Sequence, residues 1–272
     1  MSKHITSLIS QRFGKFACKE FSPWFQRIVN GSYVSLMGLD MSEFENPSSY
    51  KTLNKLFTRH LREMRSFSTE KSDFISPCDS LISECGDLDE NYALQIKGMQ
   101  YSSDEVLGEN FTQEEKKKVH NGQFINFYLS PKDYHRYHIP MDLQVLKAVH
   151  IPGKLYPVNM PSLKNRLNLF IENERVVIQC KTSDEKIFYM ILVGALNVGV
   201  MQVSFEPRIK TNASATQQSV YMYEDLHLKK GDDFGCFEMG STIVIISEER
   251  MFDLHVKSGD NVRFAQTIAK LS

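Results

Sequence analysis

Three segments of the sequence carry polar side chains that could together perform nucleophilic catalysis. Ser241 follows Gly240 directly before an apolar run. His135 and His138 lie in the segment YLSPKDYHRYHIP, and Asp79 lies in the segment ISPCDS. In an activated nucleophile, histidine takes the hydroxyl proton of serine, and aspartate orients the imidazole. Each segment alone is weak evidence, because a hydroxyl beside glycine or an aspartate near proline usually belongs to a turn.

The order Gly240–Ser241 also permits self-cleavage, although the serine does not lie in the GxSxG elbow of the hydrolases. The serine hydroxyl can attack the carbonyl carbon of the preceding glycine and convert the peptide bond into an ester. β-Elimination then breaks the chain and leaves dehydroalanine, which hydrolyses to a pyruvoyl group with loss of ammonia. This chemistry predicts a built-in ketone cofactor, and no motif for an external cofactor is evident.

A metal site is the alternative interpretation of the HxxH spacing of His135 and His138. Zinc requires three or four ligands, and the sequence has no partner motif such as HExxH or CxxC. We therefore predict no metal site and favour a structural or general-base role for these histidines.

Composition excludes several classes of protein. The 272 residues include 32 Lys+Arg and 33 Asp+Glu, so no excess of positive charge indicates nucleic-acid binding. With 42% hydrophobic residues the chain is not disordered. The longest apolar stretch, residues 190–203, is too short and too interrupted to span a bilayer. Five cysteines without a CxxC pair or an apparent secretory segment predict a reduced protein that faces the cytosol.

The pattern of apolar residues predicts a change of structure near residue 70. Before it we expect mainly helix, including one over 49–65 with Leu53, Leu56, Phe57 and Leu61 on one face. Residues 112–120 should form a helical turn or loop, and residues 211–219 a loop. After residue 73, short apolar runs between turn residues are typical of strands. They cover residues 74–85, 121–130, 143–151, 175–182, 186–205 and 240–247.

These elements predict an α+β fold. A helical N-terminal region, residues 1–70, precedes a β-rich body, residues 71–272, which we expect to be a mainly antiparallel sandwich related to barrel-sandwich domains.

The N-terminal segment 3–29 combines apolar, aromatic and basic residues. Its apolar members at helical spacing are Ile5, Leu8, Ile9, Phe13 and Phe16, and its cations are Lys3, Arg12, Lys15 and Lys19. Such a helix suits a membrane interface, where its apolar face enters the acyl boundary and its cations meet anionic lipid. Packing on the protein's own core is the alternative.

Along nearly its whole length the sequence resembles the phosphatidylserine decarboxylases of the compact prokaryotic type. The segments that carry the resemblance are YKTLNKLFTRHLR, ISPCDSLIS, YLSPKDYHRYHIP, HIPGKLYPVN, NERVVIQC, MILVGALNVG and GDDFGCFEMGST. The order of the YHRxH and GxFxxGST elements is highly specific. Met239 replaces the usual leucine of the LGST motif, and Ser80 stands where glycine is frequent. Both departures bear on the rate of maturation and leave the resemblance intact.

The resemblance implies a role for each candidate residue. Asp79, His138 and Ser241 would form a charge relay that cleaves between Gly240 and Ser241, giving a large chain 1–240 and a small chain 241–272. The pyruvoyl group derived from Ser241 would form a Schiff base with the substrate amine and accept electrons as CO2 leaves, so that phosphatidylethanolamine is released. His135 would handle the substrate carboxylate or the returning proton. Which histidine serves which step stays open.

The resemblance also implies partners and a location. The substrate would be phosphatidylserine in an anionic membrane, and the enzyme would attach peripherally to the cytoplasmic face of the cell membrane through segment 3–29. The large and small chains of one precursor would remain together, a homodimer is left open, and no nucleic acid is expected.

Three rival functions remain from the residues alone. A pyruvoyl enzyme that decarboxylates a soluble amino acid would need no membrane face. A carrier or scaffold is indicated by the GDNVRFAQTIAKL segment, which is similar to half-motifs of lipoyl and biotinyl carriers, but it would have no use for His135, His138 and Ser241 together. An inactive homologue would not be expected to keep all three groups of the relay.

Overall fold

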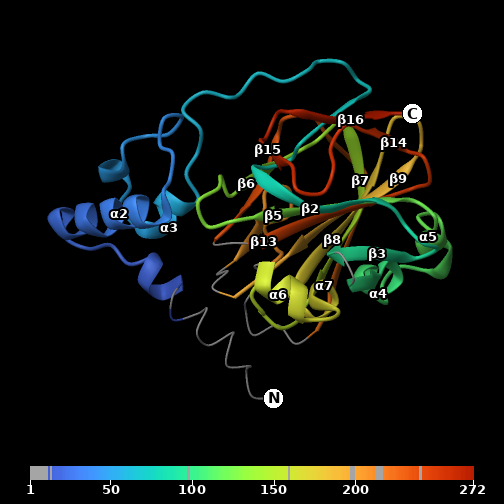
Figure 1. Cartoon of the computed structure of the whole chain (residues 1–272), viewed down its shortest axis with the longest axis horizontal. Helices are drawn as coiled ribbons and strands as arrows, with labels where there is room; N and C mark the ends of the chain where they lie inside the picture. The colour runs from blue at the N-terminus through green and yellow to red at the C-terminus, as the bar shows by residue number, and fades with distance from the viewer. Residues whose placement is uncertain are drawn as a thin grey trace.

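The computed structural model describes residues 12, 14–96, 99–158, 160–196, 200–211, 217–238 and 241–272, without the side chains of Ile96, Met160 and Ser241. The helices near the N-terminus are α2 (Pro23–Met37), the 3-10 helix η1 (Pro47–Ser49) and α3 (Leu53–Phe57). They lie at one end of the molecule, and residues 59–72 then run to the strands without helix or strand structure (Figure 1). Of the expected N-terminal helix, residues 1–11 and 13 lie outside the described residues.

The body is built on an eight-stranded sheet in which every neighbouring pair is antiparallel. Its strands in spatial order are β11 (Ser219–Leu228), β7 (Leu143–Ile151), β8 (Arg175–Lys181), β9 (Ile187–Val193), β13 (Ser241–Ser247), β5 (Gln123–Leu129), β2 (Ser80–Asp87) and β15 (Asn261–Val262). All seven residues of β9 are buried. A continuous apolar run of this kind is typical of a strand covered on both faces.

Three smaller sheets surround this one. They are β1 (Asp73–Ile75) with β16 (Thr267–Leu271) and β14 (Phe252–Leu254), β10 (Met201–Val203) with β12 (Asp233–Phe237) and β6 (Arg136–His138), and β3 (Tyr92–Ile96) with β4 (Met99–Ser102). Short helices lie beside the strands: α4 (Ser103–Leu107), α5 (Gln113–Lys117), α6 (Met160–Asn165) and α7 (Leu169–Glu172). The predicted α+β class is therefore confirmed.

Several local predictions agree with the structure, but the helix over 49–65 was predicted too long and strand β11 was not predicted. The expected helical turn at 112–120 is α5. Its N-terminus is capped by two reciprocal hydrogen bonds, in which the side chains of Thr112 and Glu115 each accept from the other residue's backbone N–H. The expected loop at 211–219 lies partly outside the described residues. The helix predicted over 49–65 is shorter than expected, since only α3 (Leu53–Phe57) is helical. Its residues Leu53, Leu56 and Phe57 are buried. Thr52 caps its start, and the chain leaves the helix after Phe57 because the next residues pack against the loop that precedes His135.

The sheet β10–β12–β6 depends on a glycine at its centre. Gly235 has φ of 150°, and a β-carbon there would lie 1.9 Å from the carbonyl oxygen of Gln202 and 2.9 Å from the ring of Tyr137. Since Gln202 lies on the neighbouring strand β10, a side chain at 235 would push the strands apart. Gly235 leads directly to the segment that ends at Ser241.

We expect Gly235→Ala to destabilise the protein by about 2 kcal/mol or more, because backbone atoms must move to admit the methyl group. Gly31→Ala in α2 is the matched control, since a β-carbon at residue 31 would meet nothing within 4 Å and alanine favours helix. Urea unfolding of both variants measures the difference. Equal midpoints would show that this sheet tolerates the methyl group.

Candidate active site

The backbone places Ser241 at the first position of β13. Ser241 is the register partner of Leu129 in β5, and Thr242 is the register partner of both Tyr128 and Val193. Met239 and Gly240 lie outside the described residues. The strand expected over 240–247 is therefore β13, and Ser241 is its first residue. The buried hydroxyl of Thr242 has no hydrogen-bond partner within the described part of the chain.

His138 lies in a closed aromatic pocket at the end of β6. Its ring stacks on Phe264 with a centroid separation of 3.7 Å, and Tyr134 stacks beside it at 5.8 Å. Nδ1 lies 3.1 Å from the carbonyl oxygen of Gly231, and Nε2 lies 3.0 Å from the hydroxyl of Tyr134. Because a carbonyl only accepts, Nδ1 carries the proton and Nε2 is a proton acceptor. Burial lowers the pKa of His138 to about 4, so the imidazole is neutral at pH 7.

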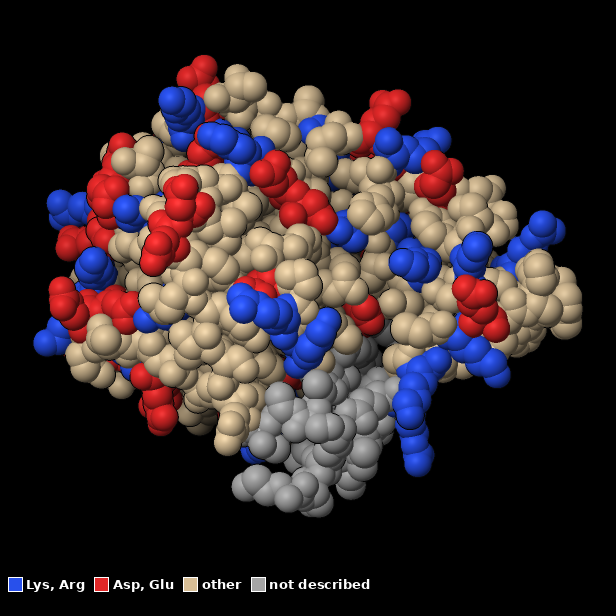
Figure 2. Space-filling view, turned by 180° about the vertical axis from the view of Figure 1, so that it is seen from behind, with Lys and Arg blue, Asp and Glu red and all other residues tan. Residues whose placement is uncertain are grey.

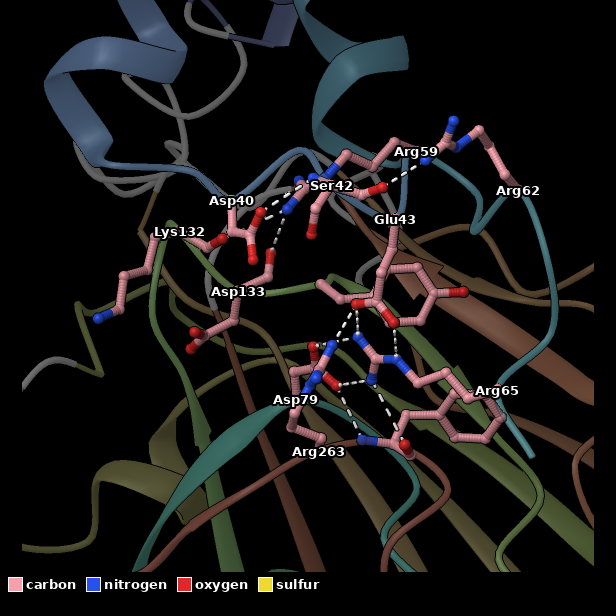
Figure 3. Close-up of polar contacts among 12 residues, drawn as sticks. Asp40, Ser42, Glu43, Arg59, Arg62, Arg65, Asp79, Lys132, Asp133 and Arg263 are labelled. Atoms are coloured by element: carbon pink, nitrogen blue, oxygen red, sulfur yellow. Dashed lines mark hydrogen bonds and ion pairs between the residues drawn. The ribbon is translucent and has the colours of Figure 1, made fainter. Parts of the chain in front are cut away.

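Asp79, which directly precedes β2, is held by Arg65. The two guanidinium nitrogens Nη1 and Nη2 donate to the two carboxylate oxygens at 2.5 and 2.9 Å. Arg65 also pairs with Glu43, which contacts Arg263 (Figure 3). The carboxylate accepts a further hydrogen bond of 2.8 Å from the backbone N–H of Phe264.

Phe264 therefore links Asp79 to His138, because its backbone N–H donates to Asp79 and its ring stacks on His138. Among the contacts of the described residues, no hydrogen bond joins the two side chains directly, as a simple charge relay would require. The arrangement makes Asp79 a residue that fixes the wall of the histidine pocket.

His135 is fully buried between the N-terminal region and the body. Its ring stacks on Phe57 of α3 with a centroid separation of 4.0 Å. Nε2 donates to the carbonyl oxygen of Ser130 at 3.0 Å, and Nδ1 has no hydrogen-bond partner among the described residues. Burial, and next the positive charge of Arg59, lower the pKa of His135 to about 3. The side chain is a neutral imidazole with one unused acceptor.

A cavity of about 690 Å³ lies between the N-terminal region and strand β12. Its cationic lining residues are Lys55, Arg59, Arg62 and Arg136. Glu238 also lines it and precedes Ser241 by three residues, so their α-carbons are at most about 11 Å apart. Burial raises the pKa of Glu238. The cavity thus places a cationic lining within reach of the predicted cleavage site.

The sequence analysis missed the residues that surround the candidates. Arg65, Tyr134 and Phe264 hold Asp79 and His138, and although all three lie in segments that the sequence analysis singled out, no pattern there marks their side chains as partners of the candidates. Tyr134 lies four residues before His138, but only the structure shows that its hydroxyl contacts the imidazole. Within the described ranges, no group of three or more His, Cys, Asp and Glu side chains is arranged to hold a metal ion.

Comparison with known proteins identifies the family of the chain. The family model described as phosphatidylserine decarboxylase matches residues 53–270. The chain is 44% identical over 268 residues to the phosphatidylserine decarboxylase proenzyme of Helicobacter pylori strain Shi470, covering 98% of this chain and 97% of the relative. It is 42% identical to the proenzyme of Campylobacter jejuni (96% and 97% covered) and 33% identical to that of Brevibacillus brevis (96% and 92%). The chain belongs to the phosphatidylserine decarboxylase family.

Proposed function

We propose that this chain decarboxylates phosphatidylserine to phosphatidylethanolamine and CO2 after cutting itself between Gly240 and Ser241. Family membership supports the reaction. The main structural support for the site is the position of Ser241. It is the first residue of the central strand β13, and the segment before it lines a cationic cavity.

The sheet explains how the protein can survive such a cut. Residues 241–272 would form the small chain, in which β13 pairs with β5 and β9 while β16 pairs with β1. All three partner strands belong to residues 1–240. The new end at 241 would therefore stay fixed by backbone hydrogen bonds on both sides of β13.

In this proposal the Ser241 hydroxyl attacks the carbonyl carbon of Gly240, and His138 is the base for the hydroxyl proton. His138 suits that role because its Nε2 is an unprotonated acceptor at neutral pH. The Tyr134 hydroxyl donates to Nε2, so this hydrogen bond must open before Nε2 can take the serine proton. Asp79 positions Phe264 against the imidazole face. Nδ1 of His135 is an unprotonated acceptor, so it can take up a proton and return it to the substrate carbon, whereas contact with the substrate carboxylate would first require its protonation.

The residues present fit a pyruvoyl group at position 241. The backbone of β13 would hold it. Two buried polar atoms, Nδ1 of His135 and the hydroxyl oxygen of Thr242, have no hydrogen-bond partner among the described residues and are available to it. When formed, the group would supply a carbonyl that accepts the electron pair of the bond broken as CO2 leaves. The protein's own contribution is to hold the headgroup, exclude water and deliver one proton.

The direct test is the intact mass of the denatured protein. Wild type should give two species that match residues 1–240 and 241–272. The smaller one should be lighter than a serine-started peptide by one ammonia, because elimination and hydrolysis convert its first serine into a pyruvoyl group. Under native conditions the two chains should co-elute. Ser241→Ala should stay at full length, and phosphatidylserine should release CO2 only with wild type. A single uncut wild-type species that still releases CO2 would refute the cleavage mechanism.

We further propose that α2 docks the enzyme on the membrane surface. The helix buries polar residues, since Gln26 is 5% and Asn30 0% exposed and Asn30 donates to the carbonyl oxygens of Pro47 and Tyr50. It leaves Trp24 66% and Ile28 54% exposed. A helix that faces only water would show the reverse pattern.

Surface charge and the state of the cysteines also bear on attachment to the cytoplasmic face of the membrane. At the end of the molecule formed by the N-terminal helices, basic side chains lie beside uncharged surface with acidic side chains among them (Figure 2). Within the described residues, no helix has the length and hydropathy to cross a bilayer. The five cysteines are free, which suits the reducing conditions at the cytoplasmic face.

Replacing Trp24 and Ile28 together by serine should weaken binding to phosphatidylserine-containing vesicles at least tenfold, because two large apolar side chains no longer enter the lipid. Vesicle flotation measures the bound fraction. Leu167→Ser is the matched control, as Leu167 is 63% exposed on the strand body. Equal binding of the double variant and the control would show that α2 is not the docking surface.

A further inference from the structure

One wall of the 690 Å³ cavity is a face of the small sheet β10–β12–β6. Arg136 of β6 and Gln202 of β10 are both register partners of Cys236 of β12, so the three residues form one row across the sheet. Side chains in such a row project from the same face, and all three residues line the cavity. Glu238 continues this lining and accepts a hydrogen bond of 2.8 Å from the side chain of Gln202. The sheet therefore holds the polar groups of this wall in place.

Arg136 turns one end of its guanidinium to this cavity. Nε and Nη2 donate to the two carboxylate oxygens of Asp233, the first at 3.1 Å. Asp233 is not among the described residues that line the cavity, so this pair fixes the guanidinium from outside it. Nη1 has no hydrogen-bond partner among the described residues, and it is not one of the unpartnered nitrogens that the protein closes off from solvent. Arg136 thus offers the cavity an accessible and oriented donor.

Lys55 and His60 line the same cavity from the N-terminal region. Burial lowers the pKa of His60, and the charge of Arg136, with a smaller contribution from Lys55, lowers it too. The three side chains are therefore close enough to repel one another across the cavity. In the described part of the chain Lys55 has no carboxylate within ion-pair distance, although it acts on Glu238 from farther away. An anion between these groups would relieve their repulsion.

We propose that Arg136 and Lys55 bind the phosphodiester of the phosphatidylserine headgroup in this cavity. This inference rests on the proposed function and adds a binding site for the substrate phosphate. The phosphodiester is the better ligand of the two anions in the headgroup, because it keeps its charge throughout the reaction. A tight ion pair with the carboxylate would stabilise the ground state and oppose the loss of CO2.

The test measures binding to the uncut Ser241→Ala protein by calorimetry, so that it does not depend on activity. The probes are glycerophosphoserine, glycerophosphoethanolamine and inorganic phosphate. Arg136→Gln should weaken both glycerophosphodiesters about tenfold or more, and Lys55→Gln about fivefold or more, because each change removes a charged hydrogen bond. Lys51→Gln is the matched control and should bind as the parent does, since Lys51 is an exposed lysine outside the cavity lining.

Inorganic phosphate should bind more weakly than glycerophosphoethanolamine, because it lacks the glycerol and amino ends that would also occupy the cavity. Equal binding of these two probes would assign the cavity to free phosphate and overturn the proposal.

The remaining outcomes also separate the alternatives. Weaker binding of glycerophosphoserine alone would assign the two cations to the carboxylate and overturn the proposal. Unchanged binding of both glycerophosphodiesters in either variant, or no binding to the Ser241→Ala parent, would overturn it too. Should Arg136→Gln fail to fold, Lys55→Gln decides by the same comparison. Failure of the proposed function would appear elsewhere, as wild-type protein that releases no CO2 from phosphatidylserine.

Discussion

The paired contacts of Arg65 with Asp79 and Glu43 connect the N-terminal region to the strand body. Glu43 follows α2, Asp79 precedes β2, and the arginine side chain between them is 11% exposed. Forked, charge-assisted hydrogen bonds of this kind fix orientation as well as distance. Because the same carboxylate holds the backbone of Phe264, and the ring of Phe264 covers His138, the position of the proposed base depends on this pair.

The segment from α3 to residue 65 supplies three contacts to the site. Phe57 stacks on His135, Arg59 reaches the loop before it, and Arg65 holds Asp79. α2 packs against η1 through Asn30, which places the proposed membrane surface directly beside this segment. The docking helix and the histidine loop are thus parts of one packed unit.

How far the sequence predicts the structure depends on the kind of signal. Strands such as β9 and β13 were predictable because continuous apolar runs leave little alternative to burial. β11 was missed because it is a half-exposed edge strand whose residues alternate with many polar ones. The residue types of the site were predictable, but their partners were not. The expected relay joined Asp79 to His138 directly, whereas Asp79 pairs with Arg65 and meets His138 only through Phe264, which lies 185 residues from Asp79 and reaches it through the tertiary fold.

The central claim is that Asp79 acts on the cleavage site as part of a unit with Arg65. The most direct measurement is the rate at which newly synthesised full-length chain is converted to the two fragments in wild type, Asp79→Asn, Arg65→Gln and the double variant. We predict that each single change slows conversion at least tenfold, and that the double variant is within about twofold of the slower single one, as expected for residues acting together. Conversion slowed by the product of the two single effects, or an Asp79→Asn variant that matures as wild type does, would contradict this account.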